Sequence, residues 1–200
     1  MNHVYIGLGN AAKDELCHFQ EHYEISAKDA DTNLHAEYFV VTENDLSELY
    51  LLDNALIESQ DAPHNLRNIK VDPPSIKNAL MHLREHRWLK MDAEEQVYWT
   101  ELIEDDVENM DELPKRILRL SLAPTIEQIL YHVHAAYLRL QAKFDDEGLA
   151  LHLLVDTSCT WVNAILADVI VQLRQHYPSL FCRLSVYLLL PPNFSQTKLP

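Results

Sequence analysis

Short apolar runs and longer stretches of helical spacing alternate along the chain. The short runs are rich in Val, Ile, Leu, Tyr and Phe, which favours strands. They predict strands at 4–6, 38–42, 69–71, 149–155 and 184–190. The run at 149–155 is apolar throughout, as expected for a strand that is buried on both faces of a sheet. Pro191 and Pro192 end the last strand.

Apolar residues at intervals of three or four predict the helices. The strongest pattern covers 124–144, where the apolar positions are Ile126, Ile129, Leu130, Val133, Tyr137, Leu140 and Phe144. A second clear helix is predicted over 160–176. Further helices are predicted directly after the first strand, after Asp72-Pro73-Pro74, and around 98–103.

The order of these elements, β-α-β, then helices, then β-α-β, predicts an α/β fold. We expect a three-layer, Rossmann-like architecture, with a mainly parallel sheet and helices on both faces. The 200 residues suit one domain, 1–200. Within it, 91–114 is predicted to be an acidic helical insert, because it holds ten acidic residues and no Lys or Arg.

Ligands of such folds bind beyond the carboxyl ends of the strands, so the loops there are the first place to look for a site. The first loop contains Gly7, Gly9 and Asn10, between a strand and a helix. Backbone N–H groups in that context can hold a phosphate. Ala12 replaces the third glycine of G-x-G-x-x-G, and no acidic residue ends the second strand. A tight turn that needs glycine dihedral angles is the alternative.

The second loop contains Asp156, Thr157, Ser158, Cys159 and Thr160, between the buried strand and the 160–176 helix. Its acid and hydroxyls could coordinate a phosphate or a metal. Capping of the helix that follows explains the same residues without a ligand. Cys159, near a helix N-terminus, is also a candidate nucleophile.

Two further patterns have a functional and a structural interpretation. His82-Leu83-Arg84-Glu85-His86 matches the H-x-x-E-H pattern of inverted zinc proteases, but the sequence offers no identifiable third ligand, and eleven histidines make a chance match easy. The acidic stretch 91–114 is either a docking face for a basic partner, a mimic of nucleic acid, or a solvated helix face, and we favour the solvated face.

Charge excludes several classes of partner. The net charge of −15 disfavours binding to nucleic acid and to anionic membranes, and it fits a basic protein partner better. The three cysteines are far apart and form no C-x-x-C pair, and the amino terminus has no secretory pattern. We therefore expect a cytoplasmic protein.

Three segments, in this order, carry a family resemblance: Val4–Asn10, Leu113–Leu122 and Leu151–Pro191. They resemble the opening strand and phosphate loop, the arginine segment, and the strand, signature loop, helix and final strand of the bacterial tubulin-like family. These proteins are relatives of tubulin and of the bacterial cell-division GTPase. Arg119 takes the position of the family's arginine, and Leu118 replaces a glycine.

The resemblance implies a GTPase domain whose activity is lost. The family's signature loop is glycine-rich, whereas this chain has no glycine between Gly9 and Gly148 and none after it. We expect Trp161 and Cys159 to crowd the phosphate position. The resemblance thus leaves a vestigial nucleotide site, formed by Gly7, Gly9, Asn10, Asp156, Thr157, Ser158 and Thr160, with no catalytic residue and no metal.

The expected function is that of a pseudo-GTPase that binds neither GTP nor GDP. It would serve as a scaffold or adaptor for a protein partner in a bacterial multi-subunit system, for instance a full-length tubulin-like relative. Two alternatives stay open: an enzyme or nucleotide-binding protein that uses the strand-end site at 156–160, and an acidic mimic of nucleic acid.

Overall fold

The five strands that can be described form one parallel sheet. The computed structural model describes residues 1–29, 36–43, 66–71, 115–144, 148–177 and 182–191. The strands are β1 (Asn2–Leu8), β2 (Ala36–Thr42), β3 (Leu66–Lys70), β4 (Leu149–Asp156) and β5 (Cys182–Leu189). Their order is β3-β2-β1-β4-β5, and each neighbouring pair is parallel.

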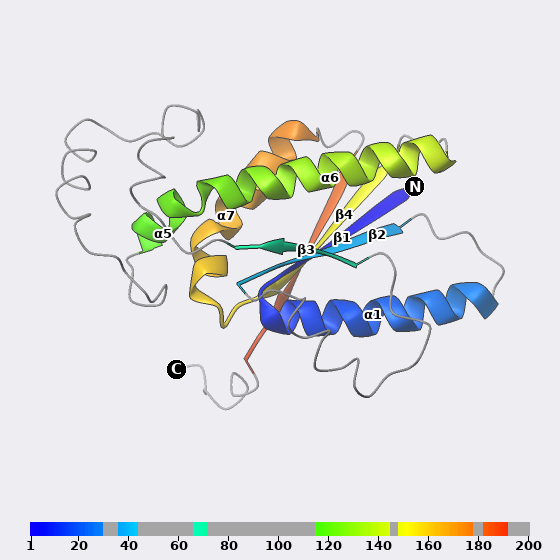
Figure 1. The fold of residues 1–200 in the computed structure, drawn as a ribbon, viewed down its shortest axis with the longest axis horizontal. Helices are drawn as coiled ribbons and strands as arrows, with labels where there is room; N and C mark the ends of the chain where they lie inside the picture. Colours follow the sequence, from blue (N-terminus) through cyan, green and yellow to red (C-terminus); the bar gives the residue numbers. More distant parts are fainter. Residues whose placement is uncertain (30–35, 44–65, 72–114, 145–147, 178–181, 192–200) are drawn as a thin grey trace.

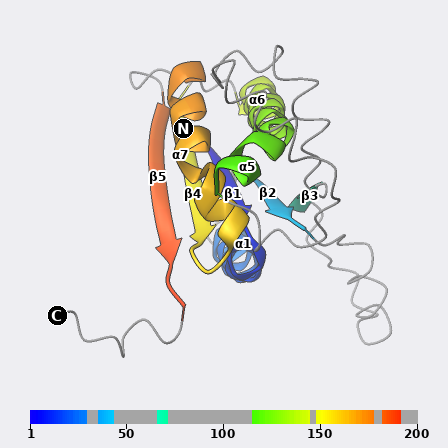
Figure 2. The ribbon, with the colours of Figure 1, turned by 90° about the vertical axis from the view of Figure 1, so that its left-hand side faces the viewer.

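Helices cover both faces of this sheet (Figure 1). The described helices are α1 (Asn10–Asp29), α5 (Lys115–Ser121), α6 (Ala123–Phe144) and α7 (Thr160–His176). Helix α1 packs on one face against β1, β2 and β4, whereas α6 and α7 lie on the other face (Figure 2). The predicted three-layer, Rossmann-like fold is therefore confirmed, with parallel pairing throughout the described sheet.

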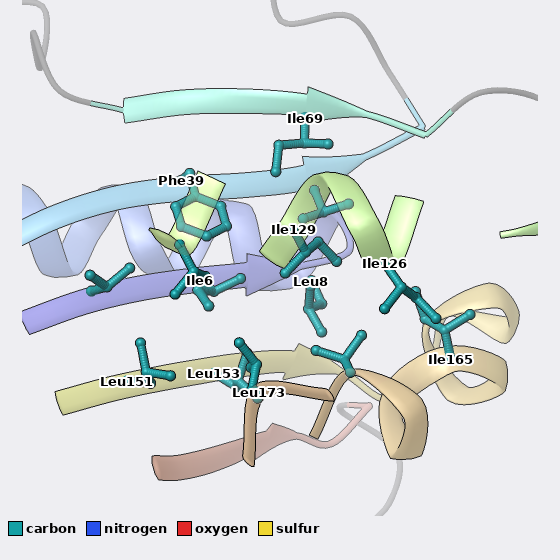
Figure 3. Close-up of a cluster of buried hydrophobic side chains, with 14 of the residues drawn as sticks. Ile6, Leu8, Phe39, Ile69, Ile126, Ile129, Leu151, Leu153, Ile165 and Leu173 are labelled. Carbon is teal, nitrogen blue, oxygen red and sulfur yellow. The ribbon is translucent and has the colours of Figure 1, made fainter. Parts of the chain in front are cut away.

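The core lies between the sheet and helices α6 and α7. Alternation along β1 turns Val4, Ile6 and Leu8 toward these helices, and all three are fully buried. Ile126 and Ile129 of α6 belong to the same core cluster (Figure 3). Each such side chain contributes about 1.5–3 kcal/mol when it is fully removed from water.

The periodic patterns located most of these elements well. The predicted helices at 124–144 and 160–176 correspond to α6 and α7, and the predicted strand at 149–155 corresponds to β4. The short helix α5 was not predicted, because seven residues complete only about two turns and show no clear period. The helix expected after Asp72, the insert at 91–114 and the His82–His86 motif lie outside the described residues.

Candidate functional site

The two predicted loops meet where the sheet reverses its winding direction. From β1 the chain passes through α1 to β2, whereas from β4 it passes through α7 to β5 on the opposite side. Strands β1 and β4 are direct neighbours, with Leu8 in register with Val155. This is the topological switch point at which doubly wound folds bind their ligands. Gly9 and Asp156 stand at its two sides.

Gly9 makes the close approach between the two loops possible. Its φ is +92°, in the left-handed region that residues with a side chain rarely adopt. A Cβ built on Gly9 would lie 2.7 Å from the Cβ of Asp156. Glycine at this position is therefore required by a neighbouring side chain of the same chain, with no need for a ligand to explain it.

The Asp156 carboxylate occupies the amino-terminal end of α1. Its Oδ2 accepts a hydrogen bond from the backbone N–H of Ala11 at 3.0 Å. Its Oδ1 accepts one from the Ser158 N–H at 3.0 Å and one from the Ser158 hydroxyl at 2.5 Å. A helix amino terminus attracts anions because its first N–H groups lack partners and the helix dipole is positive there. In this chain the anion is an internal carboxylate.

The capping interpretation of Asp156 was therefore wrong in one respect. Asp156 was expected to cap the helix that follows it, but the N-cap of α7 is Cys159, and that cap has no side-chain hydrogen bond. The carboxylate instead caps α1, a helix that begins 146 positions earlier in the chain. Pairing of β1 with β4 brings the two together, which no local pattern reveals.

Thr157, the next residue of the second loop, is hydrogen-bonded to β5 and to α7. The Thr157 hydroxyl donates to the Leu189 carbonyl oxygen at 2.6 Å, and the Thr157 N–H donates to the same oxygen at 3.2 Å. The Thr157 carbonyl oxygen accepts from the Asn163 amide at 2.9 Å. Thr160 is the first residue of α7, and Asn10 is the first residue of α1. The hydrogen bonds of Thr157 hold the loop against β5 and α7.

The expectation about Trp161 also needs correction. Trp161 was expected to fill the phosphate position, yet it is 2% exposed and belongs to the core cluster beneath α6 and α7. Cys159 packs against the same cluster. The atoms nearest to a side chain built on Gly9 are those of Asp156. Crowding at the switch point thus comes from an acid, which also repels the charge of a phosphate.

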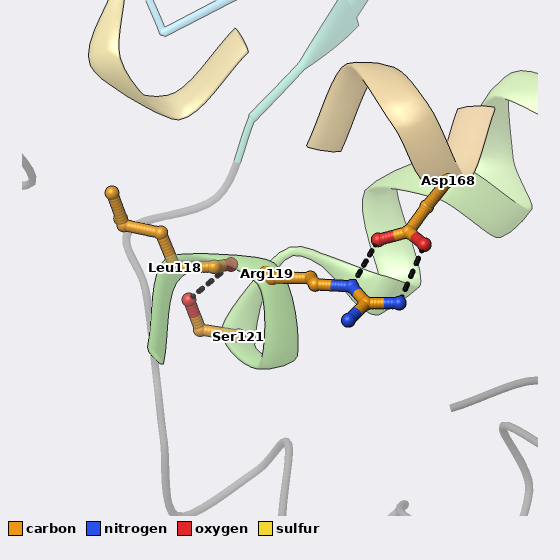
Figure 4. A network of polar contacts seen from close by, with 4 residues as sticks. All are labelled: Leu118, Arg119, Ser121 and Asp168. Atoms are coloured by element: carbon orange, nitrogen blue, oxygen red, sulfur yellow. Dashed lines mark hydrogen bonds and ion pairs between the residues drawn. The ribbon is translucent and has the colours of Figure 1, made fainter. Parts of the chain in front are cut away.

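Arg119, at the arginine position of the resemblance, forms an ion pair inside the fold. Its guanidinium makes two hydrogen bonds to the Asp168 carboxylate of α7, one of them 2.7 Å long from Nη2 to Oδ1 (Figure 4). The hydrogen bond with Asp168 raises the pKa of Arg119, so the guanidinium stays charged. The Asp168 side chain is 12% exposed. This arginine is therefore used to join α5 to α7.

A row of aromatic rings crosses the other face of the sheet, and no sequence pattern signalled it. Tyr5 of β1 stacks on His152 of β4 with ring centroids 4.4 Å apart, and Tyr38 and Tyr187 extend the row to β2 and β5. His3 Nδ1 lies 3.1 Å from His152 Nε2. Burial, and secondarily the charge of His3, lower the pKa of His152 to about 4. The two histidines are 149 positions apart.

No metal centre emerges from the described part of the chain. Within it, His, Cys, Asp and Glu side chains form no group of three that could hold an ion. None of the helices described there is long and apolar enough to cross a bilayer. Comparison of the chain with protein-family models and with curated proteins found no match in either.

Proposed function

We propose that the chain is a tubulin-like pseudo-GTPase that acts as a non-catalytic scaffold or adaptor for a protein partner. Three features support this proposal: the order of the resembling segments, a parallel sheet with a switch point between β1 and β4, and the filled position at that switch point. A fold that is common among nucleotide-binding domains is thus combined with a switch point at which the Asp156 carboxylate takes the position of a phosphate.

The Asp156 carboxylate carries this proposal. A bound phosphate at the start of α1 would need the N–H groups that this helix end presents. One of them, that of Ala11, already donates to Asp156 at 3.0 Å. A phosphate at the same place would also meet a second negative charge at short range, in a position only 6% exposed to water. Both effects weaken nucleotide binding.

Calorimetric titration with GTP and GDP in the presence of Mg²⁺ tests the proposal. We expect no binding to the wild-type chain at millimolar nucleotide. Asp156→Ala should gain weak binding of GDP, because it frees the Ala11 N–H and removes the repelling charge. Asp14→Ala is the matched control, since Asp14 is an exposed acid on α1, the helix that Asp156 caps. Micromolar binding of GTP by the wild type that depends on Thr157 or Ser158 would overturn the proposal.

The partner is a protein with a basic face, in a bacterial cytoplasmic system. The net charge of −15 supports this choice, and a full-length tubulin-like relative is one such candidate. No disulfide joins Cys17, Cys159 and Cys182, which fits a reducing compartment. Affinity purification from the native host should recover a protein whose retention weakens as salt rises. Each recovered protein should then be purified and tested for binding to the chain. The partner hypothesis would be contradicted if none of them binds.

A further inference from the structure

Strand β5 lies at one edge of the sheet that the described strands form (Figure 2). It pairs with β4 on one side, and no described strand pairs with its other side. The backbone N–H and C=O groups along such an edge are a template for another strand. Proteins commonly protect an edge with charged residues or proline within the strand. Strand β5 has one charged residue, Arg183, near its start, and from Leu184 to its end at Leu189 it has neither a charge nor a proline.

Several side chains of this edge, and that of Leu190 directly after it, are apolar and exposed. Val186, Tyr187, Leu188 and Leu190 are 37%, 50%, 55% and 53% exposed. Their register neighbours on β4, by contrast, include Leu153 and Val155, which are fully buried. Val186 and Leu188 are on the α7 face of the sheet, and Tyr187 is on the α1 face, at the end of the aromatic row. Both faces therefore present apolar surface up to this edge.

Charge is distributed unevenly along the chain, and this bears on what can cover the edge. All 31 acidic residues precede Val169, and 13 of the 16 basic residues also do, so 1–168 has a net charge of −18. Residues 169–200 carry Arg174, Arg183 and Lys198 with no acid, a net charge of +3. The β5 edge thus belongs to the part of the chain that has no carboxylates.

We infer that β5 is a self-docking edge, on which a second copy of this chain adds its own β5 in antiparallel orientation. Two acidic copies repel each other least where neither carries a carboxylate, and 169–200 meets that condition. A basic partner, which the overall charge attracts, would meet Arg183 at this edge and fits the acidic remainder of the chain better. Around a two-fold axis each edge meets an identical edge, so the same residues contribute to the interface from both copies.

A two-fold axis at Val186 gives the pairing that fits best. Val186 then faces Val186 of the second copy, and Leu188 faces the second copy's Leu184, on one side of the joined sheet. On the other side the two Tyr187 rings are diagonal neighbours, about 7–8 Å apart, which aromatic side chains can bridge. Arg183 lies opposite Leu189, so no like charges are directly opposed. The two five-stranded sheets become one continuous sheet.

Sedimentation equilibrium measures this association directly. One strand pair is a small interface, so we expect dissociation in the micromolar range. The mass should rise from 23.2 kDa toward about twice that value as the protein concentration increases. Because both copies are acidic, the dimer should become tighter between 0.1 M and 0.5 M NaCl, roughly the range over which salt screens repulsion. Binding of a basic partner has the opposite salt dependence.

Val186→Lys tests the edge itself, since it opposes two ammonium groups at the two-fold axis. We expect the dissociation constant to rise about tenfold or more. Leu188→Lys, away from the axis, should weaken the dimer as well. Leu138→Lys is the control, because Leu138 is also apolar and 49% exposed but lies on α6. Circular dichroism verifies that each variant is folded.

Two outcomes would overturn the inference. The first is a mass of 23.2 kDa at all concentrations and at both salt levels, which would leave the edge to another occupant, such as an acidic extended segment of a partner. The second is a dimer that neither Val186→Lys nor Leu188→Lys weakens. In contrast, a dimer that both weaken and Leu138→Lys leaves intact supports it.

Discussion

Removal of the Asp156 carboxylate should destabilise the fold by separating two segments that are distant in sequence. The carboxylate accepts one hydrogen bond from Ala11, at the start of α1, and two from Ser158, within its own loop. Asp156→Ala removes all three acceptor contacts. It also removes the negative charge that lies at the amino terminus of α1.

The expected loss is about 2–3 kcal/mol. Loss of a helix cap costs about 1 kcal/mol, within a range of 0.5–2 kcal/mol. The contacts with Ser158 add about 1.5 kcal/mol, the low end of the range for charged hydrogen bonds, because Ser158 is exposed and water can replace its partner. Asp156→Asn keeps an acceptor oxygen but loses the charge, so we expect about half of this effect.

Urea unfolding followed by circular dichroism is the suitable assay. Asp14→Ala is the control: Asp14 is 69% exposed and pairs only with Lys13 in the described structure, so about 0.5 kcal/mol or less should be lost. The reasoning is refuted if Asp156→Ala is no more destabilising than Asp14→Ala. In that case the carboxylate would not be the cap of α1, and it would not fill the phosphate position.

Two further predictions concern the histidine pair and the α5–α7 ion pair. Because the pKa of His152 is about 4 in the folded chain and about 6.5 when unfolded, the unfolded state binds more protons between these values and stability falls as the pH falls through them. His152→Phe should remove about 1 kcal/mol of the stability difference between pH 7 and pH 5, after allowance for partial exposure to water, and His18→Gln, at an exposed position of α1, is the control variant. Arg119→Leu leaves the Asp168 carboxylate buried without its partner and should cost about 2–3 kcal/mol in denaturant unfolding. The double variant Arg119→Leu, Asp168→Leu should recover most of that loss, and a double variant as unstable as the single one would contradict a direct pair.

Local patterns in the sequence were sufficient for most of the described elements. The spacing of Ile126, Ile129, Val133 and Leu140 predicted α6, because these positions share one face of a helix regardless of what that face meets. The continuous apolar run of β4 predicted a buried strand for a similar reason. The resemblance and the glycine pair also directed attention to the Gly9 loop, and the structure places Asp156 beside it.

The partner of Asp156 could not be predicted in this way. Both capping a nearby helix and binding a phosphate are local interpretations of Asp156, whereas one of its partners besides Ser158, the Ala11 N–H, is 145 positions away. The same holds for His3 and His152, which meet only because β1 pairs with β4. Strand order decides such contacts, and strand order depends on the packing of the whole sheet.

The two apolar strands β4 and β5 mark the boundary between what the sequence and the tertiary structure determine. Both are rich in Leu, Val and other apolar residues, and the pattern of each was enough to predict a strand. The tertiary structure alone decided that β4 is enclosed by neighbours on both sides and that β5 lies at the edge with Leu188 55% exposed. The sequence specifies the local conformation through side-chain periodicity. The burial of a strand depends on which strands and helices lie beside it, and the packing of distant segments decides this.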